Sequence, residues 1–295
     1  MAINYTLDNR LDVLGQFLNE YQRWYADILQ SKIFNAEPPQ DPQGFLKWLE
    51  GIPLEAINVD GNYAKQAQQI KAQREALIKA GLSLSEPPQD KDFKEFSGLF
   101  HDFTAALQVF CQSVILEEWG VDVLTGLKNN LIVMADLTIE MERLSREGAP
   151  FCLGLARIDD FETIEKAGDE QQTTTVIEKV AGLIQKSLRS YDDAYRVGRD
   201  HFIMCLKQSD IIGGQKALER LRDIMEEKEE HYEINGEQKL ISLSCCVAAP
   251  LPDDDVEDLI DNLYVDLDEQ IKDQGAVLTY QEMSPLQRFI QKEKD

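Results

Sequence analysis

The chain has 295 residues, which is enough for about two domains of ordinary size. Hydrophobic residues make up 43% of it and charged residues 28%, a composition typical of a folded globular protein with enough apolar side chains for two cores. The formal net charge of −24 argues against binding to nucleic acid or to an anionic membrane surface through long-range electrostatic attraction. An anionic ligand could bind only where arginines gather locally.

The N-terminus shows neither the basic nor the hydrophobic region of a secretory signal, and no apolar run reaches the ~20 residues that span a bilayer. The five cysteines form no CxxC pair, which is typical of reduced thiols buried in a core. They are Cys111, Cys152, Cys205, Cys245 and Cys246. We therefore expect a cytoplasmic protein that does not bind a membrane. With only three histidines in the chain, we expect neither a metal site nor another cofactor.

The first part of the chain is predicted to be helical. Apolar residues recur every three or four positions over Leu7–Ile28 and again over Phe93–Val114, which predicts two long amphipathic helices. A weaker pattern over Tyr63–Leu77 is interrupted by Arg74, and residues 42–50 predict a short helix. A four-helix bundle is the simplest interpretation. The same apolar stripes could equally pair with those of a second chain in a dimer.

From about residue 120 the pattern changes to alternating strands and helices. Strands are expected at Phe151–Ile158, Ala194–Gly198, Phe202–Leu206 and Leu240–Ala248, and helices at Thr174–Leu188, Gln215–Glu227 and Val256–Lys272. The order β-α-β-β-α-β describes a ferredoxin-like α+β sheet with helices on one face.

Four short strings in this region carry a family resemblance: DVLTGL at Asp122–Leu127, ARIDDF at Ala156–Phe161, GRDHF at Gly198–Phe202 and SCCVA at Ser244–Ala248. In order and spacing, and with Lys272 in the final helix, they resemble the GGDEF (diguanylate cyclase) domain. The resemblance implies a nucleotidyl-cyclase-like α+β fold. We therefore expect an all-helical bundle for sensing or dimerisation at 1–118, a degenerate GGDEF domain at 119–284 and a C-terminal tail at 285–295.

The resemblance also implies which residues should perform catalysis, and most of them are substituted. Members of the family use carboxylates to hold Mg²⁺ on GTP, because phosphoryl transfer depends on charge stabilisation. One metal carboxylate survives as Asp200. The substituted positions are Arg157 for the other metal aspartate, Glu162 for a phosphate-side lysine, Glu165 and Thr174 for the guanine-reading residues, Arg199 for the second turn glycine and His201 for the acidic residue after the metal ligand.

We therefore expect no cyclase activity. A guanidinium could replace the absent metal ion, so we predict a direct ion pair between Arg157 and Asp200. The alternative is that Arg157 points to solvent.

A second site of the family is present in the sequence. Many members bind cyclic di-GMP at an allosteric RxxD motif five residues before the turn, and Arg189 and Asp192 match it. Arg220 matches an arginine that the family supplies eighteen residues after the turn's phenylalanine, and Arg196 adds a further cation. Arginine forks suit phosphate oxygens and the guanine edge, and a carboxylate can accept from guanine N–H groups.

The leading hypothesis is a catalytically inactive cyclic di-GMP receptor, acting as a homodimer on a protein partner that the sequence does not identify. The alternative is a protein-interaction scaffold that binds no nucleotide. A third possibility, GTP binding without turnover, is disfavoured by Glu165 and Thr174 at the guanine-reading positions.

The helical part is similar to the CZB zinc-sensor module in its aromatic segments, including Phe45–Trp48 and the FTAAL string that begins at Phe103. That module binds zinc through three histidines and one cysteine. Here His101 and Cys111 are the only such residues in the region, so we expect a degenerate sensor without zinc.

Overall fold

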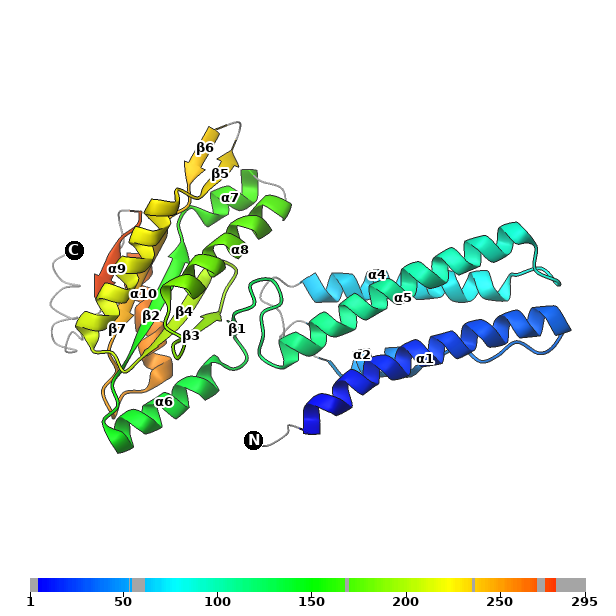
Figure 1. Cartoon of the computed structure of the whole chain (residues 1–295), viewed down its shortest axis with the longest axis horizontal. Helices are drawn as coiled ribbons and strands as arrows, with labels where there is room; N and C mark the ends of the chain where they lie inside the picture. The colour runs from blue at the N-terminus through cyan, green and yellow to red at the C-terminus, as the bar shows by residue number, and fades with distance from the viewer. Residues whose placement is uncertain are drawn as a thin grey trace. The chain divides into compact units, whose positions relative to one another are not determined.

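In the computed structural model, the residues described are 5–52, 54, 62–167, 170–234, 237–269 and 274–279. Lys272 and the predicted tail at 285–295 lie outside them. The chain divides into two compact units between Trp119 and Gly120 (Figure 1). We call them the helical unit and the sheet unit.

The helical unit contains α1 (Tyr5–Phe34), α2 (Gly44–Glu50), α4 (Asn62–Leu82) and α5 (Asp90–Glu118). Its core is rich in aromatic rings, which meet mostly edge to face, as Tyr21 and Phe103 do with ring centroids 4.7 Å apart. The apolar stripes predicted for α1 and α5 supply this core from Leu14 onward. The helical character predicted for this part of the chain is confirmed.

Arg74 of α4 lies on the buried face of its helix rather than interrupting it. Its side chain forms an ion pair with Asp41 and donates to the Pro42 carbonyl at 2.5 Å and to Tyr21 Oη at 2.7 Å. Burial raises the pKa of the Tyr21 hydroxyl to about 12. Arg74 thus ties the proline-containing segment between α1 and α2 to the bundle.

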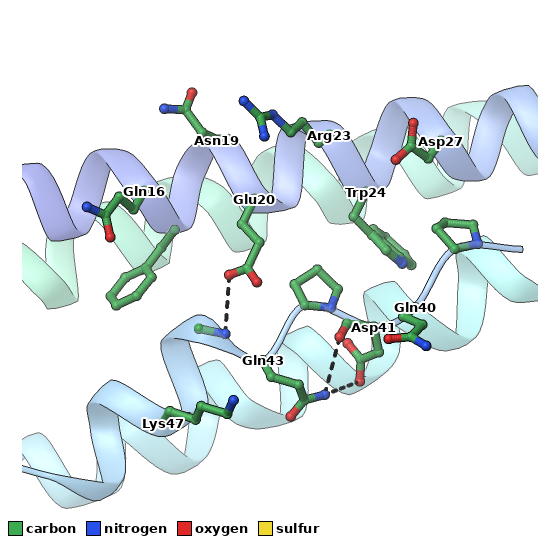
Figure 2. A pocket seen from close by; sticks show the side chains of 14 residues that line it. Gln16, Asn19, Glu20, Arg23, Trp24, Asp27, Gln40, Asp41, Gln43 and Lys47 are labelled. Atoms are coloured by element: carbon green, nitrogen blue, oxygen red, sulfur yellow. Dashed lines mark hydrogen bonds between the residues drawn. The ribbon is translucent and has the colours of Figure 1, made fainter.

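That segment and α1 border a groove of about 790 Å³, shown in Figure 2. Glu20 reaches across from α1 and accepts from the Gly44 backbone N–H at 3.2 Å. The lining of the groove includes the cations of Arg23 and Lys47 as well as carboxylates from both sides. It therefore does not strongly favour a ligand of either charge.

Helix α5 is long and apolar enough to span a membrane by length and composition alone. A core helix of a folded bundle meets the same criteria, and Phe96, Phe103 and Leu107 of α5 are fully buried in the helical unit. On the same helix, His101 is exposed while Cys111 is buried.

The sheet unit is built on a six-stranded sheet in the order β1-β3-β4-β2-β7-β8. The strands are β1 (Lys128–Asn129), β2 (Phe151–Ile158), β3 (Asp193–Arg196), β4 (His201–Lys207), β7 (Leu243–Ala248) and β8 (Val277–Thr279). The pairs β1–β3 and β7–β8 are parallel, and the central pairs are antiparallel. A separate hairpin consists of β5 (His231–Ile234) and β6 (Glu237–Leu240).

Helices cover both faces of this sheet. Helices α7 (Phe161–Ala167), α8 (Glu170–Ser187) and α9 (Ile211–Lys228) pack on one face, and α6 (Val133–Glu147) and α10 (Val256–Glu269) pack on the other. The prediction of helices on one face only was therefore wrong. The reason lies in β2 and β7, whose side chains on both faces are almost entirely buried, as expected for strands enclosed between two helical layers.

Candidate ligand site and candidate catalytic site

The end of β2 and the turn before β4 meet as the GGDEF resemblance implied. Arg157 pairs in register with His201, and the Ile158 N–H donates to the Asp200 carbonyl at 3.0 Å. The predicted ion pair between Arg157 and Asp200 is nevertheless absent from the structure. Arg157 instead forms an ion pair with Asp268 and approaches the Leu267 carbonyl at 3.4 Å.

Two features of α10 explain the direction of Arg157. The described part of α10 closes with Asp266 and Asp268 and has no basic residue in its last turn, and the Leu267 carbonyl lies within reach of the guanidinium. A guanidinium there satisfies a carboxylate and a carbonyl together. Asp200 has a different neighbour, because its Oδ1 lies 2.7 Å from Nδ1 of His201.

The other substituted positions are also satisfied within the sheet unit. Arg199 forms an ion pair with Glu165, so two of the substituted residues neutralise each other. Glu162 pairs with Lys166 at 2.7 Å one helical turn away, and Thr174 donates to the Glu170 carbonyl at 2.8 Å.

A pocket of about 470 Å³ remains at this end of the sheet. Its lining includes four acidic residues, Asp159, Asp160, Glu162 and Asp200. Among the described residues of the lining, the one basic residue is Arg157, whose charge is directed to Asp268. Such a lining repels a triphosphate unless metal ions neutralise it.

Asp159 has a structural role that the sequence analysis missed. It accepts from the hydroxyls of Ser242 and Ser244 at 2.6 and 2.5 Å and from the Gly275 N–H at 2.9 Å. One carboxylate therefore fastens the end of β2 to β7 and to the turn before β8. The serine of the SCCVA string was the available signal.

The RxxD motif forms a tight turn between α8 and β3. Asp192 Oδ2 accepts from the Arg189 N–H at 3.0 Å, and Oδ1 accepts from the Lys207 N–H of β4 at 3.0 Å. The aspartate therefore holds the turn and fastens it to the sheet. The Arg189 side chain remains exposed and donates to Tyr191 Oη at 2.9 Å.

Arg220 of α9 lies beside this turn. Its guanidinium donates to the carbonyl of Ser187, the last residue of α8, at 2.6 Å. Ser187 is two residues before Arg189, so the Arg220 guanidinium lies at the end of α8, next to the segment that carries the exposed Arg189.

These two arginines differ from the others of the sheet unit. The described part of this unit contains eight arginines, and six of them pair with a carboxylate. Arg189 and Arg220 have no such partner among the described residues and bind only a neutral hydroxyl and a carbonyl. Two uncompensated cations thus face solvent in a chain with a net charge of −24.

Arg196 does not belong to this group, contrary to the sequence-based prediction. It is fully buried and pairs with the buried carboxylate of Asp122, with Nη1 and Oδ2 3.3 Å apart. Its Nη2 donates to the Arg199 carbonyl at 3.1 Å, and Asp122 also accepts from the Thr125 N–H at 2.8 Å. Arg196 therefore connects the DVLTGL turn with the GRDHF turn and is not available to a surface ligand.

An ion network extends from the RxxD turn across β3. Asp193 binds Lys207 at 2.7 Å and Lys128 at 2.9 Å, and Lys128 also binds Asp136 at 2.7 Å. Burial alone would raise the pKa of the Asp193 carboxyl, but the hydrogen bonds from both lysines outweigh it and lower that pKa. The network fixes β1 and α6 to β3.

Comparison with known proteins identifies this unit. The family model described as the diguanylate cyclase GGDEF domain matches residues 120–275, more than half of the chain. The chain belongs to the GGDEF domain family.

The GGDEF unit is 30% identical over 128 residues to the diguanylate cyclase DgcP of Pseudomonas aeruginosa, covering 43% of this chain and 19% of that protein. It is 29% identical over 138 residues to the diguanylate cyclase DosC of Escherichia coli, covering 47% of this chain and 30% of that protein. The chain thus matches less than a third of each relative.

Among solved structures, the coiled coil and GGDEF domain of DgcB from Caulobacter crescentus, in complex with c-di-GMP, superimposes with a TM-score of 0.52. The sequence identity is 19%, and the match covers 62% of this chain and 98% of that one. This similarity establishes the fold.

The Arg196–Asp122 ion pair provides a test of what holds the GGDEF unit together. Replacing Arg196 with Leu should lower the free energy of unfolding by ~3–5 kcal/mol, because it leaves the Asp122 carboxylate buried without its cation. Arg222→Leu removes an arginine that pairs with Asp223 on the surface and should change it by less than ~1 kcal/mol. Urea denaturation of both variants measures the difference, and equal losses would contradict this role for Arg196.

Proposed function

We propose that the protein is a catalytically inactive member of the GGDEF family that binds cyclic di-GMP at Arg189, Asp192 and Arg220. The observation that carries this proposal is the pair of uncompensated arginines beside the RxxD turn. Cyclic di-GMP presents two phosphates and two guanine edges, and charge-assisted hydrogen bonds from arginine suit both.

Asp192 has a more limited part in this proposal than the sequence suggested. Both of its oxygens already accept backbone N–H groups, so its main contribution is to hold Arg189 in place. Each carboxylate oxygen can accept a second hydrogen bond, which leaves capacity for a guanine N–H.

The pairing of Arg199 with Glu165 and of Arg157 with Asp268 supports the proposed loss of catalysis. A nucleotide phosphate could bind either guanidinium only by breaking its ion pair, and the acidic lining of the pocket would oppose the phosphates. We accordingly propose a cytoplasmic receptor that acts through a protein partner rather than through product formation.

Titration calorimetry with cyclic di-GMP tests the receptor function directly. The wild-type chain should bind with a dissociation constant of about 1 μM or below, equivalent to ~8 kcal/mol. Arg189→Ala and Arg220→Ala should each weaken binding by at least ~10-fold, because each removes a charge-assisted hydrogen bond. Arg222→Ala, on the same helix as Arg220 but paired with Asp223, is the matched control and should bind like wild type. An absence of binding by the wild-type chain would leave the nucleotide-independent scaffold as the function.

Loss of catalysis predicts a negative result with substrate. GTP with excess Mg²⁺ or Mn²⁺ should not raise the melting temperature, and chromatography should detect no cyclic di-GMP after prolonged incubation. Cyclic di-GMP in the same melting assay is the positive control, because a ligand that binds only the folded state raises its stability. Product formation that increases with enzyme concentration would contradict the proposal.

We also propose that the helical unit forms a homodimer through the exposed face of α5. Val109 and Leu116 on this face are 64% and 39% exposed. Together with Ala105 and Gln112 they repeat at spacings of four, three and four, the arrangement of a two-stranded coiled-coil seam.

Light scattering should therefore give twice the chain mass of 33.6 kDa for the wild-type protein. Val109→Glu should give the monomer mass, because it brings two like charges together at the seam, whereas Val109→Leu should remain dimeric. A dimer that persists in Val109→Glu would place the interface elsewhere.

A further inference from the structure

One exposed side chain of the RxxD turn has no role in the arginine site proposed above. Tyr191, the third residue of the turn, is 45% exposed. It is the one aromatic residue among the large apolar side chains exposed in the described part of the GGDEF unit. Tyrosine combines a large apolar ring with a polar end and is therefore frequent at binding surfaces.

The ring of Tyr191 and the guanidinium of Arg189 are in contact. Nη1 of Arg189 donates to Tyr191 Oη at 2.9 Å, and the guanidinium carbon lies 5.9 Å from the ring centroid. Such a separation permits a cation–π contribution. A ligand group bound at the Arg189 guanidinium therefore lies beside the Tyr191 side chain.

The backbone of the turn does not depend on this contact. Asp192 accepts from the Arg189 and Lys207 N–H groups, and the Asp192 N–H donates to the Arg189 carbonyl at 3.1 Å. Tyr191 can consequently be replaced by another residue without disrupting the backbone turn that presents Arg189.

We propose that Tyr191 is a stacking platform for a purine base of the bound cyclic dinucleotide. In the free protein its hydroxyl holds Arg189, and on binding Arg189 leaves this neutral acceptor for an oxygen of the ligand. The exchange is favourable because a charge-assisted bond to phosphate is stronger than a bond to a phenol. The released ring offers a π face on which the base stacks. This assignment rests on the proposed function.

Two variants of the full chain, titrated with cyclic di-GMP, separate the ring from the hydroxyl. Tyr191→Leu should weaken binding by roughly 5- to 150-fold, the equivalent of the ~1–3 kcal/mol that an aromatic residue supplies to one stacked base. Tyr191→Phe keeps the ring and removes the acceptor that holds Arg189, so it should bind as tightly as wild type or more tightly.

The salt dependence of the dissociation constant is a second measurement, and it distinguishes the loss of a stacking ring from the loss of a charge. Raising the ionic strength should weaken binding of Tyr191→Leu by the same factor as wild type, because both arginines remain. Arg189→Ala should show a smaller dependence, because it has lost a charge that salt screens.

The outcomes distinguish this inference from the proposed function. If wild type binds and Tyr191→Leu binds equally well, the platform is wrong while the receptor function stands. If Tyr191→Phe loses as much affinity as Tyr191→Leu, the hydroxyl and not the ring contacts the ligand, and the platform is again wrong. If the wild-type chain does not bind, the receptor function and the platform are both overturned.

Discussion

The GGDEF unit depends on one buried ion pair. Arg196 and Asp122 are almost completely removed from water, and charges in such surroundings are tolerated only when each has partners of good geometry. Arg196 also binds the carbonyl of Arg199, and Asp122 also organises the turn at residues 122–127. The pair therefore fixes the DVLTGL turn to the GRDHF turn, which is distant in sequence. It also anchors the end of β3, because Arg196 is the last residue of that strand. Because β3 follows the RxxD turn directly, the position of the proposed ligand site depends on the same pair.

The two ends of the unit have opposite electrostatic characters. At the end of β2, Arg157 and Arg199 are each neutralised by a carboxylate, so neither guanidinium can bind a phosphate without leaving its partner. At the RxxD turn, Arg189 and Arg220 bind only neutral oxygens. When Arg189 or Arg220 leaves its neutral oxygen, no negative charge remains beside the ligand, whereas Arg157 or Arg199 would leave behind a carboxylate that repels a phosphate. An anionic ligand should therefore prefer the RxxD end.

Apolar patterns predicted the fold better than charges predicted the site. The strand at Phe151–Ile158 and the stripes of α1 and α5 could be located because burial imposes a period on the sequence. The partners of Arg74, Arg157 and Arg196 could not be predicted, because a charged residue in a sequence does not reveal which carboxylate will face it. Asp268, for example, is 111 positions from Arg157. The second helical layer could have been expected, since a nearly continuous apolar run such as that of β2 indicates burial on both faces.

The short β3 strand connects the RxxD turn to the start of the unit. It begins at Asp193, beside the RxxD turn, and ends at Arg196, which holds the turn that follows α5 in the chain. Asp193 also fixes β1 through Lys128. The turn that presents Arg189 is therefore continuous with a four-residue strand whose two ends are both bound to the opening segment of the unit.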